Sequence, residues 1–491
     1  MLRYTQKGRE AHEPMSGRHP QRVIEKLRQS WDVIVVGGGN AALVGALSAR
    51  ACGARVLVLE RTDKAFRGGN SRHTRNIRCV HDSSSRWNTG AYTQEQLWKD
   101  LCGVGRGPSN EALAELTVRE SESVPSWMNS NGAHFQQPLA GTLHLGRTNT
   151  FFLGGGKALI NSYYRRASSA GVETAYEARV DGVEFEGNRC TGLVVDVAGT
   201  PVRTAATNIV VASGGFEANI EWLSRYWGAG ALNYHIRGPR TNDGAVLARL
   251  IEAGAASAGD ERGFHSVAVD ARSPKFDGGI ATRLDAIPFG VVVNKRCERF
   301  YDEGEDVWPK RYAIWGGKIA GQPDQIAYAF WDSKVKAMFL PPMYGAFSAA
   351  TIDEVATQMG LDGAATARTV QAFNDAVAPD AVTRFDPTDV DGLSTRGLTP
   401  PKTNWALPID TAPFFGIPMR PGVTFTYMGV EVGQDARIRK VDGSVFENVF
   451  AAGEIMSGNI LSTGYLAGFG MTIGTVWGRI AGREAAAGGP H

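Results

Sequence analysis

Residues 33–61, VIVVGGGNAALVGALSARACGARVLVLER, decide the fold of this chain. The apolar run at 33–36 predicts a buried parallel strand, and the glycine-rich residues 37–42 predict a tight turn. Residues 43–52 then have the composition of a helix, and residues 55–59 that of a second strand. Together they form a complete βαβ unit, which predicts an α/β fold with a dinucleotide-binding domain.

The turn carries the residue types that a dinucleotide requires. Gly37 allows the sharp turn, and Gly39 lets a pyrophosphate approach the backbone at the positive end of the helix. Ala42 provides the small side chain that packs against the strand, and Glu60, at the end of the second strand, is placed to bind ribose hydroxyls. The alternative interpretation is a tight turn that binds no ligand.

Composition excludes several other classes of protein. The chain has 491 residues and 60 glycines, which suits a two-domain α/β enzyme. Its 52 basic and 50 acidic residues nearly cancel, so no broad field attracts nucleic acid or an anionic membrane. The five cysteines include no CxxC pair, which argues against a metal site, an iron–sulfur cluster or a disulfide scaffold. We therefore expect a reduced, cytoplasmic compartment.

The N-terminal residues 1–30 are polar and basic without the apolar core of a secretory signal, so we expect a tail there. No uninterrupted apolar run is long enough to span a bilayer, so we expect a soluble protein without a transmembrane segment.

Two later segments favour FAD over NAD. Residues 66–76, FRGGNSRHTRN, offer glycines, an amide and hydroxyls that can wrap a second face of a pyrophosphate or a flavin. Residues 449–452 predict a short buried strand that runs into Gly453 and Glu454. The helix expected after it has glycines at about every fourth position of residues 464–482. Such a helix packs closely, and its N-terminus can stabilise negative charge on a reduced flavin.

Six motifs in this order resemble the fumarate reductase/succinate dehydrogenase flavoprotein superfamily. They are VVGGGNAAL, GGNS, ASGGFEAN, NDGAVLARLIEAGA, VVVNKRCERFYDEGEDVWPKRYAIWG and AAGEIMSGN, and the resemblance runs from about residue 31 to residue 485. Within that superfamily, the chain looks most like the FAD-dependent tricarballylate dehydrogenase group. The resemblance implies a Rossmann-like FAD-binding domain of the glutathione-reductase type with an inserted α+β capping domain of the fumarate reductase type.

The resemblance also implies domain boundaries. The FAD-binding domain would comprise residues 31–263 and 426–491, and the capping, or substrate, domain would comprise residues 264–425. Proline-rich loops at 379–421 and a helix expected at 352–377 agree with this division.

The matched motifs imply which residues bind FAD. Membrane-bound relatives attach FAD through a histidine immediately before the serine that matches Ser71. This chain has Asn70 there, which implies a noncovalent cofactor. The implied cofactor-binding residues are Gly37, Gly39, Asn40, Ala41, Ala42, Glu60, Arg61, Gly68, Gly69, Asn70, Ser71, Gly214, Asp243, Gly453, Glu454 and Asn459.

Oxidation of a C–C bond beside a carboxylate removes a hydride and, from the neighbouring carbon, a proton. A proton-transfer group must therefore lie across the substrate from the flavin. The resemblance places Arg311 in that role as the catalytic residue that takes the proton. Since a guanidinium is ordinarily protonated, Arg311 would need a dry site and a relay, for which Tyr312 is a catalytic candidate. The alternative is that Arg311 only pairs with a nearby acid such as Glu305 or Asp306.

The substrate-binding positions of the family are partly altered in this chain. Relatives bind substrate with a histidine and a threonine at the positions of His265 and Thr282, but Arg283 replaces the glutamate that usually follows. Phe425 stands at the histidine of a histidine–threonine pair, and Tyr465 stands near a second arginine. A fumarate-sized diacid is therefore disfavoured, and we expect Arg283 to bind one carboxylate of a larger acid. For His265 and each tyrosine, an ordinary buried side chain is the alternative. The implied substrate-binding residues are His265, Thr282, Arg283, Thr426, Tyr427 and Tyr465.

The leading interpretation is an FAD-dependent oxidoreductase that acts on CH–CH groups. It would oxidise tricarballylate, or a similar polycarboxylic acid, to its α,β-unsaturated product, which is cis-aconitate in the case of tricarballylate. The resemblance implies a separate, membrane-associated electron-transfer protein that reoxidises FAD. The chain would then be cytoplasmic, or peripheral to the membrane through that partner.

Three alternatives stay open. A 3-ketosteroid-type delta1-dehydrogenase, or another ketone or acid desaturase, is favoured by Phe425, Thr426 and Tyr465 and disfavoured by Arg283 and Arg311. A flavoprotein oxygenase of corrin biosynthesis, whose front half resembles this group, is disfavoured by the absence of a fused cluster-binding domain. A flavin-binding module without catalysis is the third.

Overall fold

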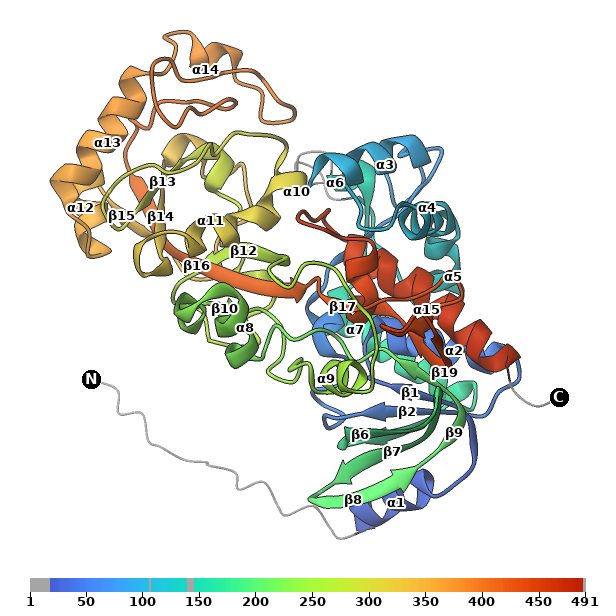
Figure 1. Cartoon of the computed structure of the whole chain (residues 1–491). Coiled ribbons are helices and arrows are strands. Elements are labelled where there is room, and N and C mark those ends of the chain that lie inside the picture. The colour runs from blue at the N-terminus through green and yellow to red at the C-terminus, as the bar shows by residue number, and fades with distance from the viewer. Residues whose placement is uncertain (1–17, 106, 139–144, 489–491) are drawn as a thin grey trace, which may run out of the picture.

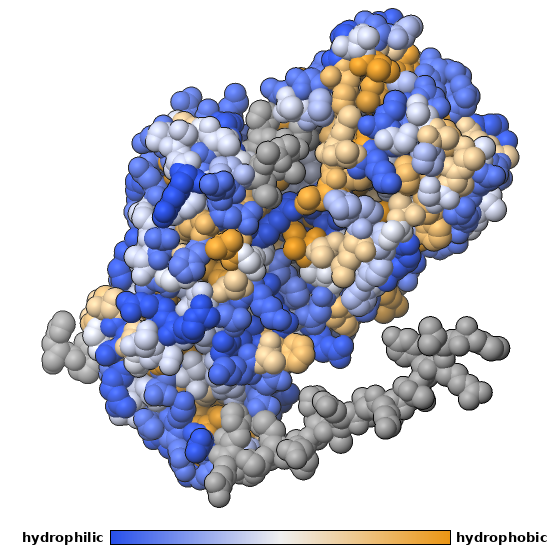
Figure 2. Space-filling model, turned by 180° about the vertical axis from the view of Figure 1, so that it is seen from behind, coloured by the Kyte–Doolittle hydropathy of each residue, from blue (hydrophilic) through white to orange (hydrophobic). Residues whose placement is uncertain are grey.

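A computed structural model describes residues 18–105, 107–138 and 145–488. Figure 1 shows a body built on one sheet and a lobe, at the upper left, built on a second sheet. In the opposite view, hydrophilic residues dominate the surface of the body, and the broadest apolar areas lie on the lobe (Figure 2). None of the helices in the described ranges is both long and apolar enough to cross a membrane.

The body is a mostly parallel sheet that packs against helices and against a second, antiparallel sheet. The order of its strands is β18, β19, β9, β1, β2 and β5, and only β18 is antiparallel to its neighbour. Parallel strands that are covered on both faces consist of continuous apolar residues. For this reason β1 and β2 could be predicted from the sequence. The strands are β1 (Trp31–Val36), β2 (Val56–Glu60), β5 (Glu173–Tyr176), β9 (Ala206–Val211), β18 (Arg437–Arg439) and β19 (Val445–Ala451).

Smaller sheets and several helices complete the body. β6, β7 and β8 form an antiparallel sheet, and β3 pairs with β4 as β11 pairs with β17. These strands are β3 (Asn76–Arg78), β4 (Asn149–Phe151), β6 (Ala178–Glu186), β7 (Arg189–Val197), β8 (Thr200–Thr204), β11 (Ser257–Ala258) and β17 (Gly429–Val430). The helices are α1 (Arg18–Leu27), α2 (Asn40–Ala51), α3 (Gln94–Gly103), α4 (Glu111–Glu120), α5 (Val124–Ser130), α6 (Leu145–Thr148), α7 (Gly155–Ser169), α9 (Ala245–Glu252) and α15 (Phe469–Ala487).

The lobe is built around the long strand β16, which pairs with β10, β12, β14 and β15, while β13 pairs with β14. Its strands are β10 (His235–Ile236), β12 (Phe264–Asp270), β13 (Val291–Asn294), β14 (Ala327–Asp332), β15 (Phe347–Ala349) and β16 (Phe414–Thr426). Its helices are α8 (Ile220–Trp227), α10 (Trp308–Arg311), α11 (Trp315–Ala320), α12 (Ile352–Gln358), α13 (Gly363–Asp375) and α14 (Ala381–Arg384).

The predicted βαβ unit is confirmed, and its boundaries move slightly. α2 begins at Asn40 and not at residue 43, because Gly39, in an extended conformation, already stands at its N-cap. α15 begins after Gly468, whose φ of 82° only glycine adopts easily.

Two helix expectations need correction. Residues 18–27 of the predicted tail form α1, whose Val23 and Leu27 are four residues apart and are buried in the core. The single helix expected at 352–377 is two helices, because Gly360 takes a φ of 79° and Asp362 caps α13 through the backbone N–H of Ala365. Residues 1–17 of the predicted tail lie outside the described residues.

The glycines of α15 allow close contact with α2, as the sequence predicts. A Cβ atom on Gly478 would lie 2.7 Å from the carbonyl oxygen of Ala41, and one on Gly482 would lie 2.2 Å from that of Gly45. Because α2 follows directly after the dinucleotide turn, this contact fixes the turn against the C-terminal helix.

Candidate active site

A cavity of about 1570 Å³, including space open to solvent, lies where the body meets the lobe. The body contributes residues at the carboxyl ends of β1, β2, β9 and β19, which is where open α/β sheets bind their ligands. The lobe contributes side chains from β12 and β16 and from the loops near them.

The β1–α2 turn is shaped to receive a pyrophosphate. Gly37 has a φ of 115°, and a Cβ atom there would lie 2.3 Å from the carbonyl oxygen of Ala212. The Asn40 backbone N–H, in the first turn of α2, donates to Ser71 Oγ at 3.0 Å. Backbone N–H groups at a helix N-terminus bind anions, so this end of the cavity suits phosphate groups.

Glu60 ends β2 at the same edge of the sheet. Its carboxylate accepts hydrogen bonds from the backbone N–H of Thr62 at 2.9 Å and of Gly68 at 3.1 Å. Next to it, Arg61 donates to Asp243 Oδ1 at 2.9 Å. These contacts hold a carboxylate in position for ribose hydroxyls.

Two buried carboxyl groups lie beside the middle of the cavity. Glu217 Oε1 accepts hydrogen bonds from the amides of Asn70 at 2.6 Å and Asn242 at 2.7 Å. Glu454 Oε1 accepts one from the Thr426 backbone N–H at 3.0 Å. Burial and then the neighbouring Glu454 raise the pKa of Glu217 well above its usual value, and burial raises the pKa of Glu454 to about 7. At neutral pH the two carboxyl groups therefore retain a proton.

Three guanidinium groups face the other end of the cavity. Arg237 is 4% exposed and donates to Thr424 Oγ1 at 3.0 Å, while Arg283 pairs with Asp285 at 2.7 Å. Burial, followed by the charge of Arg283, lowers the pKa of both Arg75 and Arg237 to about 10. Arg75 and Arg237 therefore still carry a positive charge at neutral pH, so this end of the cavity attracts anions.

Aromatic rings line the wall between these ends. His265 stacks on Tyr465, with ring centroids 3.9 Å apart, and meets the edge of Tyr312 at 5.4 Å. Neither ring nitrogen of His265 has a hydrogen-bond partner among the described residues. Burial and the charges of Arg237 and Arg283 lower the pKa of His265 well below its usual value, so its ring is neutral.

Tyr312 is also buried, and burial raises the pKa of its hydroxyl. The guanidinium of Arg283 lies 4.8 Å from the Tyr312 ring centroid, and its charge opposes that shift. A neutral phenol therefore faces the cavity beside a fixed cation.

The structure brings most of the predicted FAD-binding residues to the cavity wall, with the exceptions of Ala42, Gly68 and Asn459. Ala42 is fully buried beneath the turn, and Gly68 binds Glu60 through its backbone. The amide of Asn459 donates to backbone carbonyl groups in the core. These three residues support the residues of the cavity wall and do not line the cavity themselves.

Of the predicted substrate-binding residues, His265, Arg283 and Tyr465 line the cavity, and Thr282, Thr426 and Tyr427 do not. The other three are bound elsewhere: the Thr282 hydroxyl donates to a backbone carbonyl, the Thr426 N–H binds Glu454, and the Tyr427 hydroxyl donates to Gly464. Tyr427 is fully buried. Its position agrees with the alternative interpretation, in which this tyrosine is an ordinary buried side chain.

Tyr312 lines the cavity, but Arg311 is not among the described residues that do. Arg311 Nε lies 3.6 Å from Glu305 Oε2, and its NH2 group lies 3.9 Å from Asp306 Oδ2. These are the acids named in the alternative interpretation of the sequence, in which Arg311 only pairs with Glu305 or Asp306. Both distances are longer than a hydrogen bond, and Arg311 Nε is buried without a hydrogen-bond partner among the described residues.

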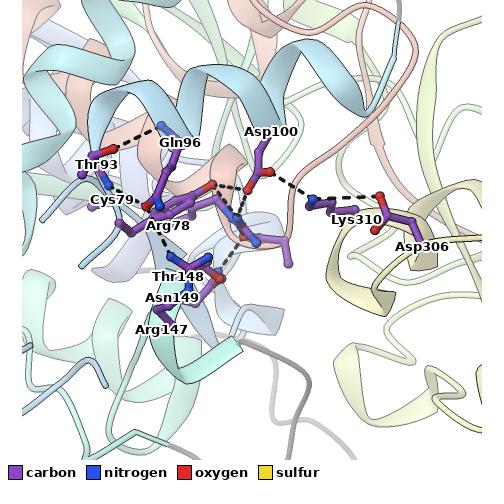
Figure 3. Close-up of polar contacts among 12 residues, drawn as sticks. Arg78, Cys79, Thr93, Gln96, Asp100, Arg147, Thr148, Asn149, Asp306 and Lys310 are labelled. Atoms are coloured by element: carbon purple, nitrogen blue, oxygen red, sulfur yellow. Dashed lines mark hydrogen bonds and ion pairs between the residues drawn. The ribbon is translucent and has the colours of Figure 1, made fainter. Parts of the chain in front are cut away.

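The neighbouring Lys310 ties this turn of the lobe to the body. Lys310 Nζ lies 3.1 Å from Asp100 Oδ1, and Asp100 Oδ2 accepts a hydrogen bond from the Tyr92 hydroxyl at 2.7 Å. The chain of contacts continues to Arg78, which is 1% exposed (Figure 3). The position of α10, and with it that of Arg311 and Tyr312, is therefore coupled to α3.

Sequence reasoning missed four polar residues of the site: Arg75, Glu217, Arg237 and Asn242. Arg75 and Glu217 stand inside the stretches FRGGNSRHTRN and ASGGFEAN, and Asn242 begins the motif NDG. A search for every polar residue of the recognised motifs would have found these three. Arg237 lies before NDG in a loop with no pattern of its own.

The residues of the cavity fit FAD. The turn at Gly37 leaves no room for a side chain, Glu60 is fixed at the ribose position, and the first turn of α15 faces the cavity at Gly470. Among the described residues no cluster of histidine, cysteine or acidic side chains could hold a metal ion, and all five cysteines are free.

Comparison with known proteins agrees with this assignment. A family model described as FAD binding domain matches residues 32–470. The NADH:fumarate oxidoreductase of Klebsiella pneumoniae (strain 342) is 26% identical over 482 residues, which cover 93% of this chain and 48% of the relative, so the chain spans about half of that protein.

Two solved structures share the fold. The open conformation of a flavocytochrome c3 fumarate reductase is 21% identical, with a TM-score of 0.71 over 98% of this chain and 83% of the other. The 3-ketosteroid delta1-dehydrogenase of Sterolibacterium denitrificans is 18% identical, with a TM-score of 0.74 over 93% of this chain and 99% of the other. The predicted α/β fold with a capping domain is confirmed. The chain belongs to the FAD binding domain family.

Proposed function

We propose that this chain is an FAD-dependent oxidoreductase that acts on the C–C bond α,β to a carboxylate of a tricarballylate-like polycarboxylic acid. The observation that carries the proposal is the end of the cavity where Arg75, Arg237 and Arg283 face the same space with one neighbouring carboxylate, Asp285. An environment of this charge favours an anionic substrate. The relative named for fumarate acts on an acid with the same arrangement of a C–C bond beside a carboxylate.

FAD, when bound, supplies the hydride acceptor, and the side chains of the cavity orient the substrate. Arg283 would bind one carboxylate, and Asp285 would hold its guanidinium in place. The neutral ring of His265 would offer a hydrogen bond from a nitrogen that has no other partner among the described residues. Because the site is buried, these contacts also exclude water from the reacting carbons.

Tyr312 is our first candidate for the group that carries the proton at its hydroxyl oxygen, because its side chain lines the cavity. Arg283 would stabilise the charge that develops when that oxygen is deprotonated. Arg311, which the resemblance implies, is the second candidate, and it would have to leave Glu305 and Asp306 to reach the substrate.

Several further properties belong to the same proposal. FAD would be noncovalent, since the amide of Asn70 stands before Ser71 and is bound to Glu217. The FAD-binding domain would comprise residues 31–263 and 426–491, with residues 264–425 as the capping domain. This division counts β10 with the FAD-binding domain, although β10 pairs with β16 in the sheet of the lobe. A separate electron-transfer protein, associated with a membrane, would reoxidise the flavin and hold the chain at the membrane periphery.

A second candidate function is a 3-ketosteroid-type desaturase. The observation that favours it is the aromatic wall formed by Tyr312, Phe425 and Tyr465. The guanidinium groups at the end of the same cavity disfavour it, because a neutral steroid would leave Arg75 and Arg237 without counter-charge.

Anaerobic reduction of the bound flavin tests the proposal. We expect tricarballylate to bleach the visible absorbance of the FAD-loaded protein, with one cis-aconitate formed for each flavin reduced, and a 3-ketosteroid to have no effect. Bleaching by the steroid alone would favour the second candidate. The primary proposal is wrong if no polycarboxylate reduces the flavin and no unsaturated polycarboxylate reoxidises it.

A further inference from the structure

We infer that Arg75 and Arg237 form a second anion subsite, distinct from the Arg283–Asp285 pair, that binds a second carboxylate of the substrate. The inference rests on the proposed function, because it assigns substrate groups within the same cavity. It restricts the substrate class to acids with at least two carboxylates.

The first observation is that Arg75 has no anionic partner. Its side chain faces the cavity from the segment just before β3, and it forms no hydrogen bond or ion pair with the described residues. Its Nε atom is buried without a hydrogen-bond partner, and its guanidinium carbon lies 5.9 Å from the centroid of the Phe151 ring. A buried guanidinium without a counter-charge is costly unless a ligand supplies one.

The second observation concerns Arg237, which lies in the loop after β10. Its Nε donates to the Gly279 carbonyl at 3.2 Å and its NH1 donates to Thr424 Oγ1 at 3.0 Å. Both acceptors are neutral, so they orient the guanidinium and leave its charge uncompensated. The side chain is 4% exposed and lines the cavity, so bulk solvent does not screen that charge.

The third observation is that Arg283 is already paired. Asp285 lies 2.7 Å from it, accepts a hydrogen bond from the Trp308 indole at 2.7 Å, and compensates one positive charge. Arg75 and Arg237 each repel Arg283 and one another. The ring of His265, near Arg237 and Arg283, is neutral, so the positive charges of Arg75 and Arg237 remain for the substrate to neutralise.

These observations assign different carboxylates of the substrate to different arginines. Arg283, with its ring neighbour Tyr312, would bind the carboxylate beside the reacting C–C bond. Arg75 and Arg237 would bind a carboxylate farther along the molecule, in the bidentate geometry that arginine offers. A monocarboxylate would leave two buried cations unpaired and would bind weakly.

The test is a titration that needs no turnover. FAD-loaded wild type, Arg75→Gln and Arg237→Gln would be titrated under air-free conditions with cis-aconitate, fumarate and acrylate, and the shift of the flavin spectrum would give each Kd. Matched controls are Arg72→Gln and Arg240→Gln, which change neighbouring arginines that do not line the cavity. FAD content and melting temperature would show that every variant is folded.

For the wild type we expect affinity to fall in the order tricarboxylate, dicarboxylate, monocarboxylate. Each of Arg75→Gln and Arg237→Gln should raise the Kd for cis-aconitate about tenfold or more and leave that for acrylate unchanged. Arg75→Lys, which keeps the charge, should recover part of the loss, and the controls should match the wild type. Unchanged Kd values for cis-aconitate in both Gln variants, or equal affinity of the wild type for all three acids, would overturn the subsite.

The outcomes separate this inference from the proposed function. Tight, Arg75-dependent binding of polycarboxylates without flavin reduction would support the subsite and contradict the proposed reaction. Flavin reduction by tricarballylate with the same KM in wild type and Gln variants would support the reaction and contradict the subsite.

Discussion

At the scale of single residues, Arg311 and Tyr312 are the two candidates for the group that accepts the substrate proton. Arg311 is held by Glu305 and Asp306, whereas Tyr312 reaches the cavity wall. We expect Tyr312→Phe to lower the rate of flavin reduction by about a hundredfold or more, because it removes the hydroxyl proton and keeps the ring. Arg311→Ala should change that rate by less than about threefold, since this side chain lies outside the cavity. Stopped-flow absorbance with the anaerobic, FAD-loaded variants measures both rates.

The opposite result would be equally informative. If Arg311→Ala abolishes flavin reduction while Tyr312→Phe reduces normally, the proton role belongs to Arg311. The ion pairs with Glu305 and Asp306 would then have to break when substrate binds. Normal FAD content in both variants is the control.

The sequence predicted the residues around the cofactor better than those around the substrate. Gly37 and Glu60 belong to one short segment, and the spacing of strand, turn and helix in that segment largely determines their positions in the fold. The substrate end collects side chains such as Arg75, Arg237 and Arg283 from segments far apart in the chain, and a linear pattern does not show which of them converge. Arg311 illustrates the difficulty, because two nearby acids compete for its charge.

At the scale of elements, the contact between α2 and α15 supports the dinucleotide turn. A Cβ atom on Gly482 would lie 2.2 Å from the carbonyl oxygen of Gly45, an atom of the backbone that cannot rotate away. We expect Gly482→Ala to destabilise the chain by about 1–3 kcal/mol and to weaken FAD binding, because α2 must shift. Denaturant unfolding and flavin fluorescence on release measure the two effects.

The matched control is Gly103→Ala at the end of α3, where a Cβ atom meets nothing within 4 Å. That change should be neutral or slightly stabilising, since alanine favours helix more than glycine does. Equal stability and FAD affinity in Gly482→Ala would show that the two helices can separate without cost.

Elements were predictable from the sequence where their pattern was continuous. The apolar runs of β1 and β2 and the small residues of α15 are local features. The break between α12 and α13 was missed because apolar spacing continues across it, and only the conformation of Gly360 interrupts the helix. α1 was missed because only Val23, Leu27 and the partly buried Ile24 of this polar segment pack against the core.

At the scale of the whole molecule, the buried acids Glu217 and Glu454 make stability depend on pH. Both pKa values are raised in the folded state, that of Glu454 to about 7 against about 4.3 in an unfolded chain. The folded state therefore binds more protons between these values, and the stability of the FAD-free chain should fall as pH rises through that window. Glu454→Gln should lose part of this dependence, because Glu217 stays buried and keeps its own contribution. Melting curves from pH 5 to pH 8 give the difference between variant and wild type.

The histidines contribute equally to the pH dependence of the wild type and of Glu454→Gln. Their contribution therefore cancels when the two sets of melting curves are compared. Parallel curves for Glu454→Gln and the wild type would contradict the assignment. Glu431→Gln, at an exposed surface ion pair, is the control and should leave the slope unchanged.

The contact between body and lobe leads to a second prediction at this scale. Lys310→Gln removes a partly exposed ion pair with Asp100 and should cost less than about 1 kcal/mol. Asp100→Asn should cost more, because Asp100 is also the nearest acid to the buried guanidinium of Arg78, at 3.5 Å (Figure 3). Urea unfolding of both variants tests the order, and equal costs would mean that Arg78 does not depend on Asp100.

The order of strands in the main sheet has a consequence for synthesis. β9 lies between β1, near the start of the chain, and β19, near its end, and the cavity is closed by residues up to Gly474. A nascent polypeptide on the ribosome therefore lacks one wall of the flavin site until Gly474 has been translated. Cofactor loading must follow synthesis of that residue, so the βαβ unit alone, although made early, does not complete the flavin site.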